Sequence, residues 1–410
     1  MSALRVRDVA KGFGDFYVPR FEISAGGVAI PASVVRDVIQ VTYNDSTTEI
    51  DSFDITVNNW DDTRRQFKYV GSETTTQSSI ALHTLFEPCA HDFELKLGYG
   101  SDLVSIVKGS PQTLEPSFPA GGAPTLTVRA LNVLFRLQTK KHRDHWIDKR
   151  ISDVAEDIGQ RNEPGGGGKR FPIPIRLPPS NVRQKEPKLD YVAMDNQYDI
   201  DFLVLEARKI GYVVYVDLEQ QRNGPPREVL HFGPSNARQA GMPATAYELK
   251  WGESLIDFSP KLSTVNQVKS VEVRGWDRQR NRSIRKKVTA RSQDLHVNRD
   301  LLHLVDPGGS PGTVGCRPRE EITVNEPQFT PEQTERRALG LMEEKLKQLV
   351  QATGTTIGLP DLRAGQHVRI VGFGARFSGT YFVTRTTHTI GDSGYTTKFT
   401  AHRERGEDAA

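Results

Sequence analysis

The first residues that could do chemistry are His142, Asp144 and His145 in the stretch KHRDHW. Imidazoles and carboxylates are common metal ligands, but histidines three residues apart lack the i, i+4 spacing that places both on one helical face. No cysteine lies near them. We therefore interpret the stretch as a solvated basic turn anchored by Trp146, and we predict no metal site.

A glycine run from Gly165 to Gly168, followed by a lysine, resembles a phosphate-binding loop at first sight. In such a loop the first glycine would fall at Glu163, and Arg170 replaces the Ser or Thr that would hold magnesium. The prolines that follow also oppose the helix whose N-terminus would bind the phosphate. We predict no nucleotide site here and no cofactor for the chain.

Signatures of catalysis are equally sparse. The sequence contains no Gly-x-Ser-x-Gly nucleophile motif. The adjacent carboxylates Glu343 and Glu344 stand beside Lys345 and Lys347, a pattern typical of a solvated, ion-paired helix face. We assign no catalytic residue and predict that the protein is not an enzyme; a carboxylate pair brought together only by folding stays an open alternative.

The most prominent charge feature is the run RQRNRSIRKK, from Arg278 to Lys287. A basic hairpin tip can hold nucleic-acid phosphates. However, no aromatic residue is interleaved to stack bases, and 54 basic against 51 acidic residues leave a net charge of only +3. We favour an acidic protein partner, or simple solvation of a long hairpin, over specific nucleic-acid binding.

Composition narrows the protein class further. No apolar run approaches the roughly 18 residues needed to span a bilayer, and the start of the chain has no apolar core of a signal peptide. Cys89 and Cys316 are the only cysteines, which fits synthesis in a reducing cytoplasm. We predict cytoplasmic assembly and no membrane binding. The 35 glycines and 24 prolines suit many short strands and turns.

These features must be positioned by a fold that we predict to be α+β and mainly β. Residues 1–138 alternate with period two and form a first β domain, and residues 139–245 mix helices and strands. Residues 246–410 are β-rich again, with a polar insertion at about 291–329 and a helix at about 331–352.

Helix starts carry the clearest local signals. Ser152 is expected to cap a short helix, and Asp199 a second one that ends near Gly211. Thr330 and Pro331 combine an N-cap with proline at the first helical position, so the helix over 331–352 is the best defined. Its apolar face includes Leu346.

Three passages in this order resemble one family, the baseplate hub proteins of contractile phage tails and related injection machines. This is the late control D family, which is also similar to the hub part of type VI secretion (VgrG) spike proteins. The first passage, residues 93–137, has the hairpin that ends in Gly-Tyr-Gly. The second, residues 196–236, has Asp-x-x-Phe-Leu at the helix start and Gly-Tyr at the next strand. The third, residues 362–405, has the Gly-x-Tyr and Gly-Tyr-x-Thr landmarks, and residues 271–284 also look similar to the family.

This resemblance implies a structural protein with two tail-tube-like β-barrel domains and smaller intervening segments. Such hubs are homotrimers, so six tube-like units adapt the sixfold inner tube to a threefold spike and line the central channel. The implied partners are the inner tube protein, a spike protein and other baseplate proteins. Because this chain ends soon after the last predicted strand, we expect the spike to be a separate chain. The finished particle would be a phage tail or a contractile injection system.

Two of the similar passages supply candidate interface residues. These are Arg278 and Arg280 in the basic run, and Arg376, Phe377 and Tyr381 near the start of the last strands. The alternative function is a tail-associated peptidoglycan hydrolase, for which we find no spare segment.

Overall fold

Strands dominate the computed structural model, which confirms the predicted mainly β, α+β class. The helices are few, and most of them lie in the middle and the last third of the chain. The structure describes residues 2–6, 18–71, 84–138, 140–162, 168–169, 171, 173–219, 227–235, 245–278, 280–305, 319–325 and 328–406.

The N-terminal third forms one side of a large, mostly antiparallel sheet. Its strands alternate sharply: in β5 (Ser52–Asn58), Phe53, Ile55 and Val57 are buried while their neighbours are half-buried. Period-two alternation is what a sheet with one covered face requires. The strand order is β3 (Val28–Ala29), β2 (Pro19–Ala25), β8 (Phe93–Tyr99), β9 (Asp102–Ser117), β10 (Thr125–Asn132), β5 and β4 (Val38–Ser46), with α2 (Ala32–Asp37), β6 (Trp60–Asp61) and β7 (Gln66–Phe67) beside it.

The C-terminal part forms the other side of the same sheet. Its strand order is β17 (Leu255–Leu262), β21 (Val350–Ile357), β24 (Gly394–Arg405), β23 (Gly379–Gly391), β22 (His367–Val371), β16 (Thr245–Lys250) and β1 (Ser2–Arg5). The first strand thus pairs in parallel with β16, so the start of the chain lies among C-terminal strands.

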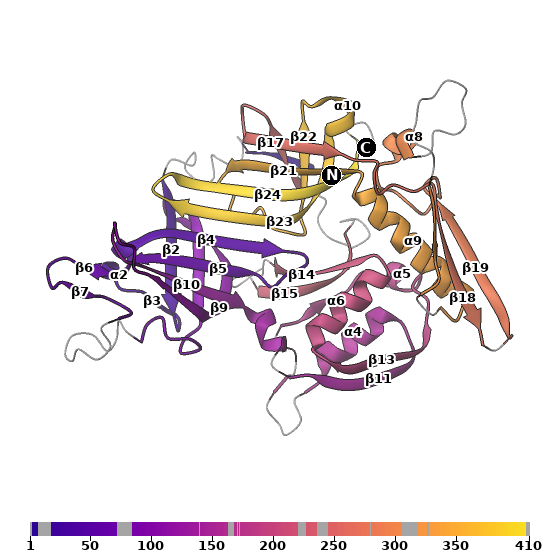
Figure 1. Cartoon of the computed structure of the whole chain (residues 1–410), viewed down its shortest axis with the longest axis horizontal. Coiled ribbons are helices and arrows are strands. Elements are labelled where there is room, and N and C mark those ends of the chain that lie inside the picture. Colours follow the sequence, from indigo (N-terminus) through magenta and orange to yellow (C-terminus); the bar gives the residue numbers. More distant parts are fainter. Residues whose placement is uncertain are drawn as a thin grey trace.

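One long strand, β23, joins the two sides. Its first residues, Gly379 to Phe382, pair with β22, whereas Arg385 to Gly391 pair with β4 of the N-terminal side. Its other edge pairs with β24 along its whole length. The result is a single 14-stranded sheet that contains strands of both the N-terminal and the C-terminal parts of the chain (Figure 1).

The middle of the chain packs two helices between two small sheets (Figure 1). Helices α4 (Ile151–Gln160) and α6 (Asp199–Lys209) bury their apolar faces in one core. Around them lie η2 (Val133–Gln138), α5 (Ser180–Arg183), the pair β11 (His142–Lys149) and β13 (Leu189–Gln197), and the triple β12 (Ile175–Arg176), β15 (Arg227–Pro234) and β14 (Tyr212–Glu219).

Both helices in the middle begin slightly earlier than predicted. Arg150, not Ser152, is the N-cap of α4, and the Ser152 hydroxyl instead donates to buried Glu186 at 2.5 Å. Tyr198 precedes α6, so Asp199 is its first residue rather than its cap. The Asp199 carboxylate, in the first turn of α6, instead stabilises the positive end of the helix dipole.

A further three-stranded sheet is covered on one side by a long helix. Strands β19 (Arg282–Thr289), β18 (Ser270–Asp277) and β20 (Glu320–Thr323) form the sheet, and α9 (Pro331–Lys347) packs on β18 and β19 (Figure 1). The predicted N-cap is confirmed, since the backbone N–H of Gln333 donates to Thr330 Oγ1 at 3.2 Å. The helix ends at Lys347, not near residue 352, because Val350 already begins β21.

The predicted polar insertion at 291–329 is only partly an insertion. Leu295, Val297 and Leu301 are buried in the C-terminal core, and β20 pairs with β18. The segment also contains η3 (Arg299–Leu301) and α8 (Leu302–Val305). These apolar residues are widely spaced among polar ones, so the mean hydropathy of the segment is low and did not indicate core positions. Residues 306–318 lie outside the described part.

The buried apolar residues form three clusters, one for each side of the large sheet and one for the middle. The N-terminal cluster also takes in Ile390 and Tyr395 from the last two strands. The division of the chain into domains at residues 138 and 245 stays a prediction.

Candidate assembly interface

The hairpin of β18 and β19 carries the predicted candidates Arg278 and Arg280. Eight cross-strand pairs, from Ser270–Thr289 to Asp277–Arg282, fix its register. Near its end, Gly275 is obligatory, because a Cβ there would lie 2.3 Å from the carbonyl oxygen of Gln328. This close approach brings the chain entering α9 alongside the hairpin end.

Both arginines are exposed and lie where the hairpin turns. The Arg278 guanidinium stacks on the Phe329 ring, 3.9 Å from its centroid. The Arg280 amide donates to Asp277 Oδ1 at 3.0 Å, and its side chain lies 3.9 Å from the other carboxylate oxygen. Arginine over an aromatic ring is held in place yet keeps its donors free, as protein interfaces favour.

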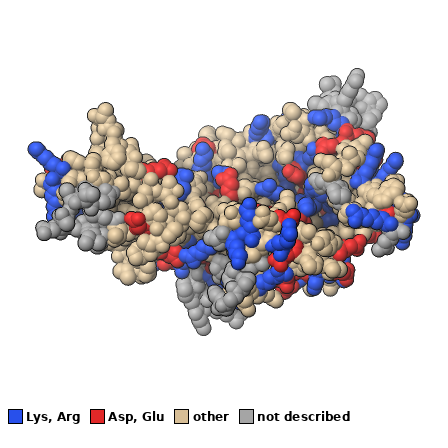
Figure 2. All heavy atoms as spheres, turned by 60° about the horizontal axis from the view of Figure 1, so that its bottom comes forward, with Lys and Arg blue, Asp and Glu red and all other residues tan. Residues whose placement is uncertain are grey.

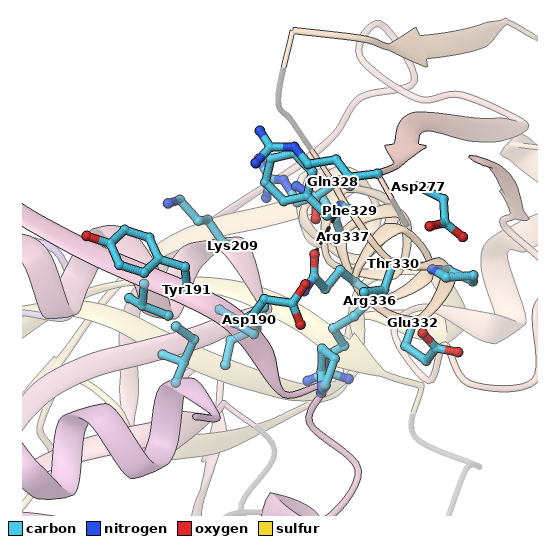
Figure 3. Close-up of a pocket in the computed structure, with 18 of the residues that line it drawn as sticks. Asp190, Tyr191, Lys209, Asp277, Gln328, Phe329, Thr330, Glu332, Arg336 and Arg337 are labelled. Atoms are coloured by element: carbon cyan, nitrogen blue, oxygen red, sulfur yellow. Dashed lines mark hydrogen bonds between the residues drawn. The ribbon is translucent and has the colours of Figure 1, made fainter. Parts of the chain in front are cut away.

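Beside this turn lies a groove of about 710 Å³ between two parts of the molecule. In Figure 3, Phe329, Arg336 and Arg337 border it from the side of α9, and Tyr191 and Lys209 from β13 and the end of α6. The two sides meet at Gly340, where a Cβ would lie 3.3 Å from the Lys209 carbonyl oxygen.

The groove carries charges of both signs. Lys209 Nζ donates to the Glu206 carboxylate at 2.5 Å. The Arg336 guanidinium lies over the Tyr212 ring, 5.6 Å from its centroid. The buried Nε of Arg336 has no hydrogen-bond partner among the described residues. Burial and the nearby Glu186 carboxylate raise the pKa of Tyr212, whose hydroxyl donates to Glu186 at 2.8 Å. A groove with charges of both signs and the exposed Tyr191 side chain suits contact with another protein.

The other three candidates lie elsewhere, around α10 (Gly374–Phe377). Arg376 is exposed and Phe377 half-buried, but Tyr381 is fully buried in the C-terminal core. The Tyr381 hydroxyl donates to the Phe377 carbonyl at 2.7 Å, so within this chain it fixes the turn. Figure 1 places α10 far from the turn of β18 and β19, so the structure does not bring the five residues together. Their role at an interface stays a prediction.

A buried ion pair between the two sides of the large sheet was missed by the sequence reasoning. Arg363 Nε donates to Asp45 Oδ2 at 2.7 Å, and its Nη1 donates to the Ile106 carbonyl at 2.9 Å. Burial and the charge of Asp45 raise the pKa of neighbouring Asp51. The paired residues are 318 positions apart, and no local pattern connects them.

The predicted metal-free stretch around His142 is a strand, β11, and not a turn. Exposure alternates along the first half of this strand, which pairs with β13. This alternation directs the Trp146 side chain into the core. Its polar groups have separate partners: His142 Nδ1 lies 3.4 Å from Asp199, Asp144 pairs with Arg161 at 2.6 Å, and the His145 ring stacks on Tyr191. Among the residues that the structure describes, no three potential ligands gather to hold a metal.

Two further predictions have a limited structural outcome. Residues 163–167, which include most of the glycine run, lie outside the described residues. In the described part of the chain, no helix combines the length and apolarity needed to cross a membrane.

Comparison with known proteins gives a family and a fold. The model of a family described as the Alg8 N-terminal domain matches residues 17–392. No curated protein matches the chain.

Solved structures with a similar fold come from phage tails and a secretion system. The 43 kDa tail protein of prophage MuSo2 from Shewanella oneidensis is 14% identical, with a TM-score of 0.61 over 94% of this chain and 98% of that one. A tail protein from Neisseria meningitidis MC58 is 11% identical, with a TM-score of 0.59 over 94% and 97%. The E. coli c3393 protein, a component of the type VI secretion system, is 11% identical, with a TM-score of 0.51 over 93% and 77%. The resemblance predicted from the sequence is thus confirmed as a likeness of fold along nearly the whole chain.

Proposed function

The chain belongs to the Alg8 N-terminal domain family and has the fold of phage tail proteins. From this fold we propose that it is the structural baseplate hub of a contractile injection machine. In this role it adapts the sixfold inner tube to the threefold spike and lines the central channel. The function is structural, and the chemistry required is noncovalent contact with other chains.

The observation that carries the proposal is the fusion of two β bodies through β23. Gly379 to Phe382 pair with one side of the sheet and Arg385 to Gly391 with the other, so force on one body passes directly into the other. A hydrogen-bonded strand shared by two bodies resists separation better than a loop, because many backbone bonds must break together. This suits a part that lies between a moving tube and a spike.

The proposed assembly is a homotrimer. With two tube-like bodies per chain, three chains present six such bodies to the tube and three equivalent surfaces to the spike. The hub would bind the inner tube protein, the spike as a separate chain, and other baseplate proteins. Assembly in the cytoplasm would be followed by incorporation into a phage tail or contractile injection particle.

Reconstitution tests this role. The purified chain is mixed with the inner tube protein and the spike protein of its own machine, and the products are imaged by electron microscopy. We expect a threefold ring with a central opening that carries tube on one side and spike on the other. Rings without tube or spike attachment, or cleavage of purified cell wall that one carboxylate substitution abolishes, would contradict a structural hub.

A further inference from the structure

The sheet β19-β18-β20 has one face covered by α9 and one face open. Val271, Val273 and Val288 are buried against the core on the α9 side. Because side chains alternate along a strand, the residues between them point to the opposite side. We call this opposite side the outer face, and it comprises Glu272, Arg274, Trp276, Arg285, Lys287 and Ile322.

The outer face exposes large apolar side chains. Trp276 is 49% exposed and Ile322 is 52% exposed, and Val324 just after β20 is 64% exposed. Single exposed apolar residues are ordinary, but tryptophan together with arginine is the composition of binding hot spots. Nothing in the function proposed above uses these side chains.

The positive charge on this face is only partly neutralised. Arg274 and Arg285 stand directly opposite each other, and like charges in that position destabilise a sheet. Arg274 Nε donates to Glu272 at 2.6 Å, and Lys287 Nζ to Glu320 at 2.8 Å. Arg285 is exposed, and among the described residues no ion pair of its guanidinium is found. A carboxylate placed between the two arginines would remove their repulsion.

The hairpin turn extends the same positive field. The run from Arg278 to Lys287 contains six basic residues and no acidic one, although the whole chain carries only +3. The Asp277 carboxylate lies 3.9 Å from the Arg280 side chain and 3.8 Å from that of Arg282. Figure 2 shows Lys and Arg gathered at the right-hand end of the molecule, where β18 and β19 lie.

We propose that the outer face is a docking surface for an acidic protein segment, whose carboxylates lie against Arg274 and Arg285 and whose apolar side chains cover Trp276 and Ile322. A protein segment fits better than a nucleic acid, because Trp276 and Ile322 are about half exposed and require apolar contact, which a phosphate backbone does not offer. The surface does not depend on the hub role, since it lies within one chain.

Fluorescence anisotropy tests the proposal with a defined probe, a labelled twelve-residue peptide of alternating glutamate and valine, added to the full chain. We expect saturable binding that weakens as salt rises, and at least tenfold weaker binding by Arg285→Glu and by Trp276→Ala. Arg285→Glu replaces a like-charge pair by an opposite-charge pair with Arg274, so the fold should be retained. The matched control is Lys398→Glu, at the exposed position of the otherwise largely buried strand β24, which should bind as the natural chain does.

Several results would overturn the proposal. One is the absence of saturable binding, or equal binding by the Arg285→Glu variant. Another is equal binding of a lysine–valine peptide, which would show a merely apolar surface. Tighter, Arg285-dependent binding of a twelve-base single-stranded DNA would assign the face to nucleic acid. Loss of self-association in Arg285→Glu would assign it to a second copy of the chain.

Discussion

At the scale of single residues, the pair of Arg363 and Asp45 connects the two sides of the large sheet. Both side chains are buried, so removing one partner leaves an uncompensated charge. We expect Arg363→Ala to lower the free energy of unfolding by about 3–5 kcal/mol. The comparison is Arg385→Ala, which breaks the exposed pair with Glu49 and should cost at most about 1 kcal/mol. Urea denaturation measures both, and equal small losses would contradict this assignment.

A buried histidine should make the stability depend on pH. Burial and the nearby charge of Arg363 lower the pKa of His388 to about 3, while its ring contacts Tyr395 and the Leu362 carbonyl. Between about pH 6.5 and 3, His388 is therefore protonated in the unfolded chain but neutral in the folded chain. The contribution of neutral, buried His388 to the free energy of unfolding is fully present above pH 6.5. Below pH 6.5 this contribution falls by about 1.4 kcal/mol per pH unit.

The variant His388→Gln isolates this effect. Its stability deficit relative to the natural chain should be largest at pH 7 and should shrink as the pH falls to 5, because only the natural chain has this proton to exclude. Urea denaturation at a series of pH values gives the difference. A deficit that stays constant over this range would show that His388 is not buried in its neutral form.

At the scale of elements, α9 is the helix on which the smaller sheet depends. Leu346 is fully buried in the C-terminal core, while Glu344 two residues earlier is exposed. Leu346→Asp places a charge in that core and should lower the free energy of unfolding by several kcal/mol or prevent folding. Glu344→Asp introduces the same residue on the exposed face and should change it by less than about 1 kcal/mol. A melting temperature unchanged in Leu346→Asp would mean that this face is not packed.

The sequence predicted the start of this helix but not its end. Thr330 and Pro331 are local signals, and they placed the first turn correctly. Leu349 and Val350 continue the apolar spacing of the helix, yet Val350 begins a strand in which burial alternates. A short apolar run fits either element, and only its pairing partners β17 and β24, far away along the chain, decide between them.

At the scale of the whole molecule, ordered motifs were enough to identify the fold but not the sites. The passage with Gly211 and Tyr212, where β14 begins, was one of those on which the resemblance depended, and the likeness of fold is confirmed along nearly the whole chain. The groove beside Phe329 and the pair of Arg363 with Asp45 join residues distant in sequence. Such contacts leave no periodic pattern in the sequence, so they can be identified only from the three-dimensional structure.

The central claim is that three copies of this chain form the hub. Native mass spectrometry of the purified full-length protein tests it most directly, because it counts chains without reference to partners. We predict a species of three times the 45.8 kDa of one chain that persists on dilution to low micromolar concentration. A monomer, or a closed assembly of two or four chains, would contradict the hub.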